Sequence, residues 1–123
     1  KEKLALGERC ILVSGGETTV TVKGSGKGGR NTEFALAFAA ETDGIEGITL
    51  LSAGSDGNDG ETEAAGAVVN GHSARRGREA GMSPIGSLEN NDSYTFFERT
   101  AGLFITGPTG TNVMDFQIVG INL

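Results

Sequence analysis

The sequence predicts an α/β fold in which a mixed β-sheet is covered by helices within a single domain, and three observations support this. A chain of 123 residues has room for one domain with one core. Short apolar, β-prone runs alternate with segments of helical periodicity. Glycine provides 21 of the 123 residues, against a usual share of about 7%, and it gathers in loops between those segments. Loops of this kind are where ligand sites are built.

The β-prone runs are short and bounded by glycine. Residues 10–14 and 17–23 flank the pair Gly15-Gly16, which predicts a β-hairpin. Residues 48–53 predict a buried strand that leads into a polar loop. Residues 61–70 are ambiguous, with a helix favoured at first and then a short strand at residues 67–69, and further strands are expected at 103–106 and at 114–121.

Three further helices are expected. Asn31 is a good N-cap for a helix that follows it to about residue 42, where Phe34 and Phe38 share one apolar stripe. A basic helix is predicted over residues 72–80, and another over residues 92–99. Residues 1–9 are polar and form a segment of their own before the domain at residues 10–123.

Composition excludes several classes of function. The net charge of −6 disfavours general binding to nucleic acid or to an anionic membrane, because both require a basic face. The sequence has no apolar run of membrane-spanning length. A single cysteine, Cys10, cannot form an internal disulfide, so a cytoplasmic protein is expected. A small anionic ligand is still compatible with this charge, because a local cluster of basic groups can outweigh it.

The glycine-rich loop over residues 24–29 leads directly into the first predicted helix. A helix start supplies unpaired N–H groups, and glycines allow a ligand to approach the backbone closely. Lys27 and Arg30 add positive charge. The pattern favours binding of an oxyanion such as phosphate by Lys27, Gly28, Gly29, Arg30 and Asn31. The alternative is an exposed connection in which the basic side chains are merely solvated.

The same loop matches the dinucleotide pattern G-x-G-x-x-G at Gly24, Gly26 and Gly29. That pattern should follow a fully buried strand, whereas residues 18–23 are half polar. The acidic partner expected about 20 residues later falls in a predicted turn. The match to a nicotinamide-dinucleotide site is therefore weak, and a P-loop is excluded because no G-K-[ST] is present.

Two further loops carry polar groups. Asp56 and Asp59 follow the buried strand and could orient a hydroxyl group or a divalent cation, although Asx-turns explain them equally well. Residues 107–112 hold Thr109, Gly110, Thr111 and Asn112, which could contact ligand oxygens. No metal site is predicted in this domain, since the single histidine, His72, has no partner at metal-ligand spacing.

Six motifs taken together resemble one family, the C-terminal MOFRL domain of class II glycerate kinases, also named hydroxypyruvate reductases. Each motif is generic alone, but six in this order are specific, and they run from about Cys10 to the end of the chain. They are residues 12–20 (LVSGGETTV), 28–33 (GGRNTE), 55–60 (SDGNDG), 63–67 (EAAGA), 91–94 (NDSY) and 106–113 (TGPTGTNV).

The resemblance implies an ATP-dependent, Mg²⁺-requiring transfer of phosphate to the 2-hydroxyl group of D-glycerate. In that family the site lies between this domain and a larger N-terminal catalytic domain, so this chain alone would be inactive. By the motif match, Arg30 would stabilise charge on the phosphoryl group or the substrate carboxylate. Asp56 would position the hydroxyl group or a metal ion, with Asp59 and residues 109–112 as further contacts. Thr32 and Ser55 stand where Gln and Thr are common in the family.

Two alternatives remain at this point. The family's second name and the G-x-G-x-x-G match allow an NAD(P)-dependent hydroxypyruvate reductase. A stand-alone module that binds small anions is the non-enzymatic alternative. A homodimer is as compatible with the sequence as a monomer.

Overall fold

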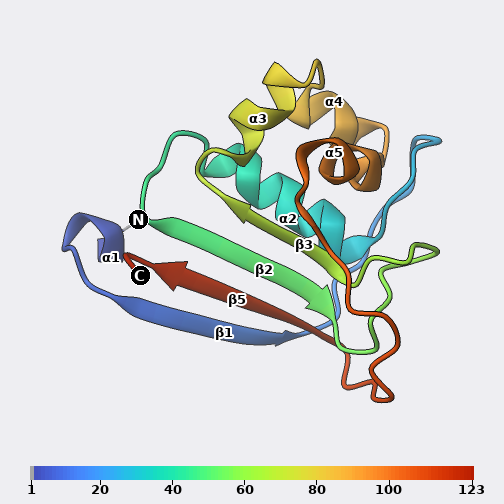
Figure 1. The fold of residues 1–123 in the computed structure, drawn as a ribbon, viewed down its shortest axis with the longest axis horizontal. Helices are drawn as coiled ribbons and strands as arrows, with labels where there is room; N and C mark the ends of the chain where they lie inside the picture. The colour runs from blue at the N-terminus through green and yellow to red at the C-terminus, as the bar shows by residue number, and fades with distance from the viewer. Residues whose placement is uncertain (1) are drawn as a thin grey trace.

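The computed structural model describes residues 2–123, and Figure 1 shows a sheet with helices on one side of it. The elements in chain order are α1 (Glu2–Ala5), β1 (Cys10–Gly16), α2 (Arg30–Glu41), β2 (Ile48–Gly54), β3 (Gly66–Asn70), α3 (Ser73–Glu79), α4 (Pro84–Glu89), α5 (Ser93–Thr100), β4 (Leu103–Phe104) and β5 (Asp115–Ile121). The strand order is β1-β5-β2-β3-β4. The predicted α/β domain is confirmed, with one difference: every pairing between these strands is antiparallel, where a mixed sheet was expected.

The core lies between the sheet and α2. Leu36 on α2 and Leu50 on β2 are fully buried, and α2 packs over β2 and β3. Phe96 and Phe97 on α5 complete the core, with their rings edge to face at a centroid distance of 5.3 Å. Full burial of side chains of this size contributes roughly 1.5–3 kcal/mol each. This packing fixes the start of α2 relative to the ends of the strands, where the polar loops gather.

The helices predicted after Asn31 and over residues 72–80 and 92–99 are confirmed to within two residues, whereas the helix favoured at the start of residues 61–70 does not form and one predicted strand is absent from the sheet. The hairpin around Gly15-Gly16 does not form, because β1 pairs with β5 and residues 17–23 are extended without joining the sheet. Helix α4 was not predicted, although Ser83 is its N-cap and Pro84 its first residue. None of the helices between residues 2 and 123 combines the length and the apolar character needed to cross a bilayer.

One end of the sheet brings together the loops that the sequence singled out. β1 and β2 end there at Gly16 and Gly54, and β5 begins there at Asp115. The register places Gly54 and Gly16 on either side of Asp115. Polar loops therefore converge at this end of the sheet.

Candidate functional site

The glycine-rich loop over residues 24–29 packs against the segment Asn90–Tyr94 rather than opening toward solvent. A Cβ atom added at Gly24 would lie 2.3 Å from the carbonyl oxygen of Asn90. One added at Gly26 would lie 2.3 Å from Cβ of Asp92. Real Cβ atoms do not approach other atoms this closely, so only glycine fits at these two positions.

Hydrogen bonds fix this contact between the two segments. The amide of Gly24 donates to Oδ1 of Asn91 at 2.9 Å, and that of Lys27 donates to Oδ1 of Asp92 at 2.9 Å. Because these amides are already bonded to the protein, they are not available to a ligand. At Gly24 and Gly26, glycine therefore allows the protein's own backbone to approach closely, and the prediction that this loop binds a ligand stays a prediction.

A glycine substitution in this loop is expected to reduce stability. Gly26→Ala should lower the free energy of unfolding by about 2 kcal/mol, because the backbone that a methyl group meets cannot move aside. Urea denaturation measures this, and Ser25→Ala is the matched control because Ser25 is exposed in the same loop. If the glycines served ligand approach instead, Gly26→Ala would leave the unfolding midpoint unchanged.

The start of α2 is occupied by a carboxylate of the protein itself. Asp59 is 1% exposed, and its two oxygens accept hydrogen bonds from the amides of Asn31 and Thr32, each at 2.8 Å. The hydroxyl group of Thr32 donates to the same carboxylate. Gly29, not Asn31, is the N-cap residue of the helix. Asp59 therefore occupies the amides of Asn31 and Thr32 and holds the start of this helix in place, while the prediction that residues here bind an anion stays a prediction.

Arg30 lies at the end of the sheet and is held there by two carboxylates. Its Nε and Nη2 atoms donate to the two oxygens of Asp115, and the Nη2 bond measures 3.0 Å. Nη1 lies 3.4 Å from Oε1 of Glu17. The side chain of Asp115 is 1% exposed, whereas that of Arg30 is 32% exposed. The hydrogen bonds to Asp115 raise the pKa of Arg30 further, so the guanidinium group carries its charge at any accessible pH.

Asp56 and the loop over residues 107–112 meet beside this arginine. The amide of Thr109 donates to the carbonyl of Asp56 at 3.3 Å, and its hydroxyl group donates to the carbonyl of Ser55. A Cβ atom added at Gly54 would lie 3.3 Å from Oδ1 of Asp56 and 3.5 Å from Oδ1 of Asp115. The carboxylates of Asp56 and Asp115 thus lie on the same side of Gly54, and Arg30 is bound to Asp115.

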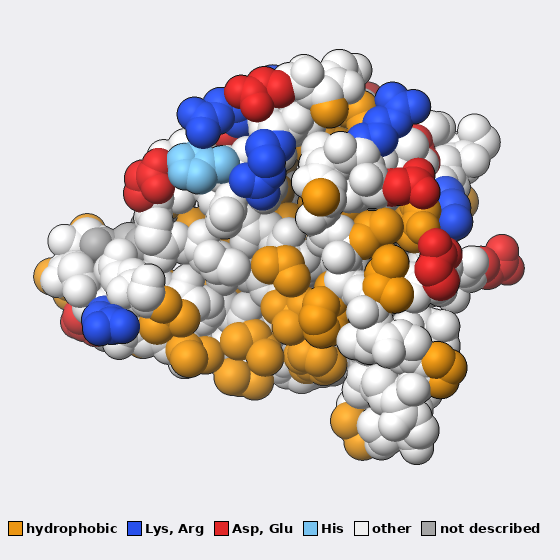
Figure 2. All heavy atoms as spheres, in the orientation of Figure 1, with side chains coloured by type: hydrophobic (Ala, Val, Ile, Leu, Met, Phe, Trp, Pro, Cys, Tyr) orange, Lys and Arg blue, Asp and Glu red, His pale blue; other side chains and the backbone are white. Residues whose placement is uncertain are grey.

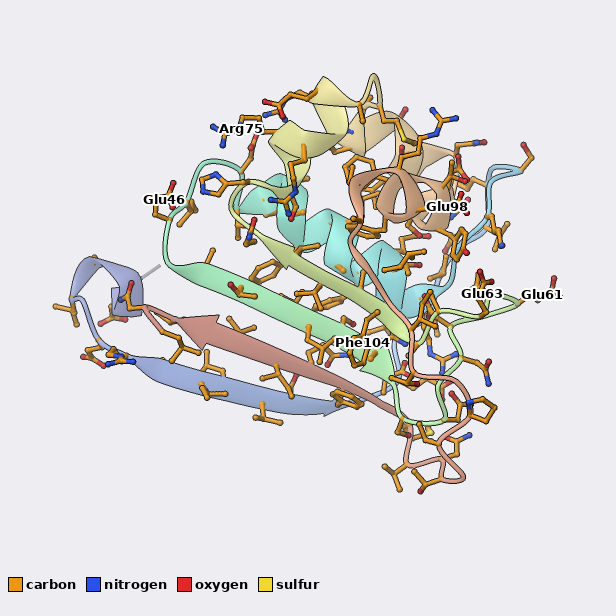
Figure 3. All side chains as sticks on the ribbon, viewed as in Figure 1. Glu46, Glu61, Glu63, Arg75, Glu98 and Phe104 are labelled. Carbon is orange, nitrogen blue, oxygen red and sulfur yellow. The ribbon has the colours of Figure 1, made fainter. Side chains whose placement is uncertain are left out.

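Lys27 belongs to a separate cluster with Glu63 and Tyr94. Its Nζ atom lies 3.8 Å from the centroid of the Tyr94 ring and 3.7 Å from Oε2 of Glu63. The hydroxyl group of Tyr94 donates to Glu63, which Figure 3 shows on the loop between β2 and β3. This hydrogen bond raises the pKa of Tyr94 to about 12 and lowers the pKa of Glu63. Lys27 is therefore engaged away from Arg30.

The pKa of Tyr94 can be tested directly, because this chain has one tyrosine and no tryptophan. Titration by the absorbance of tyrosinate should give a midpoint of about 12, which should fall toward 10.0 in Glu63→Gln. Since the folded-state pKa is raised, the interaction stabilises the fold fully below pH 10.0 and is lost as the pH rises through about 12. Glu98→Gln is the control, since Glu98 raises this pKa through its charge alone, without a hydrogen bond to the tyrosine. A midpoint near 10.0 before unfolding would contradict the contact.

The predicted site residues thus divide into three groups. Arg30 and Asp56 lie at one end of the sheet with the loop that carries Thr109, Gly110, Thr111 and Asn112, and all four of these loop residues are exposed. Gly28, Gly29, Asn31 and Asp59 build the start of α2, and Lys27 lies apart with Tyr94.

Sequence reasoning missed Asp115 and Glu17 as partners of Arg30. The sequence does show a carboxylate, Asp115, at the start of a predicted strand. That position alone does not reveal that Asp115 binds Arg30, which lies 85 residues earlier.

The surface beside Arg30 is hollowed. A depression of about 180 Å³ is lined by Arg30, Glu33 and Phe34 of α2 and by Thr18 and Thr19 of the extended segment. Within residues 2–123 no three His, Cys, Asp or Glu side chains lie together in a way that could hold a metal ion. An exposed cation beside an open hollow can bind a carboxylate or a phosphate group.

Comparison with known proteins extends this description. A model of the MOFRL family matches residues 10–115. A D-glycerate 2-kinase of Thermotoga maritima is 53% identical over 110 residues, which are 89% of this chain and 26% of that protein. A protein of Agrobacterium vitis named "Putative hydroxypyruvate reductase" is 46% identical over 89% of this chain and 29% of its own length. The crystal structure of a glycerate kinase from Thermotoga maritima matches 90% of this chain and 27% of its own with a TM-score of 0.89. The chain therefore spans about a quarter of the length of these relatives.

Proposed function

Because the chain belongs to the MOFRL family, we propose that it is the C-terminal domain of an ATP-dependent D-glycerate 2-kinase. In this proposal the domain forms one wall of a site whose other wall is a larger N-terminal domain. The names of the relatives support the kinase activity, and their greater length supports the second domain. The substrate is a small hydroxy acid whose carboxylate and acceptor hydroxyl group face this wall.

The observation that carries the proposal is the geometry of Arg30. A guanidinium group has five N–H donors, and Asp115 takes two of them. Asp115 is buried and holds the group in one orientation, whereas Glu17 is more exposed and lies farther away, at 3.4 Å. We infer that a substrate carboxylate or phosphoryl group takes the place of Glu17. A fixed positive charge at this point would stabilise the charge that develops in phosphoryl transfer.

Asp56 and the loop over residues 109–112 would contribute polar contacts to the same wall. The hydroxyl group of Thr109 and the amide of Thr111 already bond within the two loops, so the loops are held together before a ligand arrives. The carboxylate of Asp56 accepts a hydrogen bond from the amide of Asn58 at 3.0 Å, which leaves carboxylate lone pairs for a substrate hydroxyl group. Such prearranged contacts lower the entropic cost of aligning the acceptor.

ATP and Mg²⁺ fit this wall only in part. Arg30 offers a contact for a phosphate group, but no cluster of carboxylates among residues 2–123 could hold the ion alone. A magnesium ion would therefore take most of its ligands from phosphate oxygens, water and the N-terminal domain, as such ions usually do. When bound, the ion neutralises charge on the phosphates, and the residues of this domain orient the acceptor.

A second candidate, an NAD(P)-dependent hydroxypyruvate reductase, is favoured only by the name of some relatives. The loop with the G-x-G-x-x-G pattern argues against it. Gly24 and Gly26 face the segment at Asn90, and the helix start that should receive a pyrophosphate holds the carboxylate of Asp59. A dinucleotide would have to displace a buried, fully hydrogen-bonded carboxylate.

The deciding experiment assays the whole native polypeptide that contains this domain. We expect ADP release that requires both D-glycerate and Mg²⁺, and ³¹P spectra should show the phosphate on the 2-hydroxyl group. Oxidation of NADH by hydroxypyruvate in the absence of ADP release would overturn the proposal in favour of the reductase. A second experiment measures binding to residues 1–123 alone by calorimetry. Micromolar binding of glycerate or a nucleotide would indicate that this domain is a self-sufficient binding module instead.

A further inference from the structure

The face of the sheet that points away from the helices is apolar across four strands. The register places Val13, Ile118, Leu51 and Val68 directly opposite one another on β1, β5, β2 and β3. Successive side chains of a strand point to opposite faces. Because Leu50 is fully buried beneath α2, its neighbour Leu51 and the whole row point to the opposite side.

This surface, the open face, consists of Ile11, Val13, Leu51, Val68, Phe116 and Ile118. Val13 is 71% exposed, Ile11 59% and Val68 39%. None of the described strands carries an Asp, Glu, Lys or Arg at a position pointing to this side. Figure 2 shows the hydrophobic side chains gathered over the strands, while the charged side chains lie around the helices and at the margins.

An antiparallel sheet with one face in water normally alternates apolar and polar side chains, and the polar side chains point outward. Here the rows on both faces are apolar, which is the pattern of a sheet packed between two layers. A contiguous apolar surface without charge is also rare on an isolated soluble domain. The register therefore indicates that a second layer covers the open face in the native protein.

We propose that the open face is covered by another part of the same polypeptide, outside residues 1–123. This chain corresponds to 26% of the Thermotoga maritima kinase and to 27% of the related crystal structure, so about three quarters of such a polypeptide lies elsewhere. An interface with no charged residues is typical of a permanent contact rather than of a transient one. The inference rests on the proposed function only in requiring the longer polypeptide, and it does not depend on the reaction.

Thiol labelling of the native polypeptide tests the proposal. In a Cys10→Ser background, Val13→Cys and Val68→Cys place thiols on the open face, and both changes are small in volume. Arg75→Cys on α3 is the reference, because that side chain is 60% exposed on the far side of the helices. Reaction with a maleimide, followed by peptide mass spectrometry, should be about ten-fold or more slower at residues 13 and 68 than at residue 75.

Three other results would overturn the proposal. Equal rates at all three sites would show that the open face is free. Protection that disappears on dilution would indicate a second copy of the chain instead. A photo-crosslinker at residue 13 that captures only peptides from residues 1–123 would also exclude the proposed occupant. Labelling needs no substrate, so a failed kinase assay would not affect this result. Equal labelling rates, in turn, would not affect the kinase assay.

Discussion

In the native polypeptide, Arg30→Ala should lower kcat/KM for phosphorylation of D-glycerate by about a hundred- to a thousand-fold, the usual cost of removing one preorganised group that stabilises transition-state charge. The reason is the fixed position of the guanidinium group, which Asp115 holds through two hydrogen bonds. A coupled assay of ADP release measures the effect. Arg75→Ala is the matched control, because Arg75 pairs with Glu79 and His72 on the surface, and it should retain full activity.

Loss of the fold could imitate this result, because Arg30→Ala leaves the buried carboxylate of Asp115 without its counter-ion. We expect that cost to be on the order of 2 kcal/mol, reduced by the partial exposure of Arg30. The double variant with Asp115→Asn removes the unpaired charge, so it should regain most of the stability but none of the activity. Wild-type turnover in either variant would contradict the role given to Arg30.

Asp59→Ala should destabilise the protein by about 3 kcal/mol without any direct contact to substrate. The change leaves the amides of Asn31 and Thr32 and one hydroxyl group buried without their shared acceptor. Urea denaturation followed by circular dichroism measures the loss. The stability of Asp59→Asn should lie between those of the wild type and Asp59→Ala, because one acceptor oxygen remains.

Asp43→Ala is the control for this change. Asp43 pairs with Arg78 on the surface, where such a pair contributes no more than about 1 kcal/mol. If Asp59 acted as a ligand contact rather than as the cap of α2, its removal would leave the unfolding midpoint near that of the control. The two variants therefore separate a structural carboxylate from a functional one.

Local patterns were sufficient to predict most elements of the fold. The apolar stripe through Phe34 and Phe38 and the surrounding glycines located α2 to within two residues at its start and one residue at its end. Strand partners could not be predicted in the same way, since β1 pairs with residues more than a hundred positions later. The Gly15-Gly16 pair suggested a local hairpin because turn chemistry acts between neighbours, whereas the hydrophobic sheet interior selected β5 instead.

The candidate site was predictable in its loops but not in its contacts. Residue type alone placed Arg30 and Asp56 among the candidates, and the structure brings them to the same end of the sheet. The sequence could not show that the glycine-rich loop and Asp59 bond to the protein itself, because a glycine that meets protein backbone looks in sequence like one that meets phosphate, and a carboxylate at a helix start looks like one that contacts a ligand. Only the structure shows that Gly24 and Gly26 meet Asn90 and Asp92 of the protein itself.

The strand order has a consequence for how the chain folds. β5 lies between β1 and β2, yet it is the last of these five strands to be synthesised, so this sheet remains in two pieces until residues 115–121 have left the ribosome. Until then β1, with Ile11 and Val13, has no partner and is open to misassociation. Contacts of such long sequence separation slow folding, and the final strand closes the domain in a single late step.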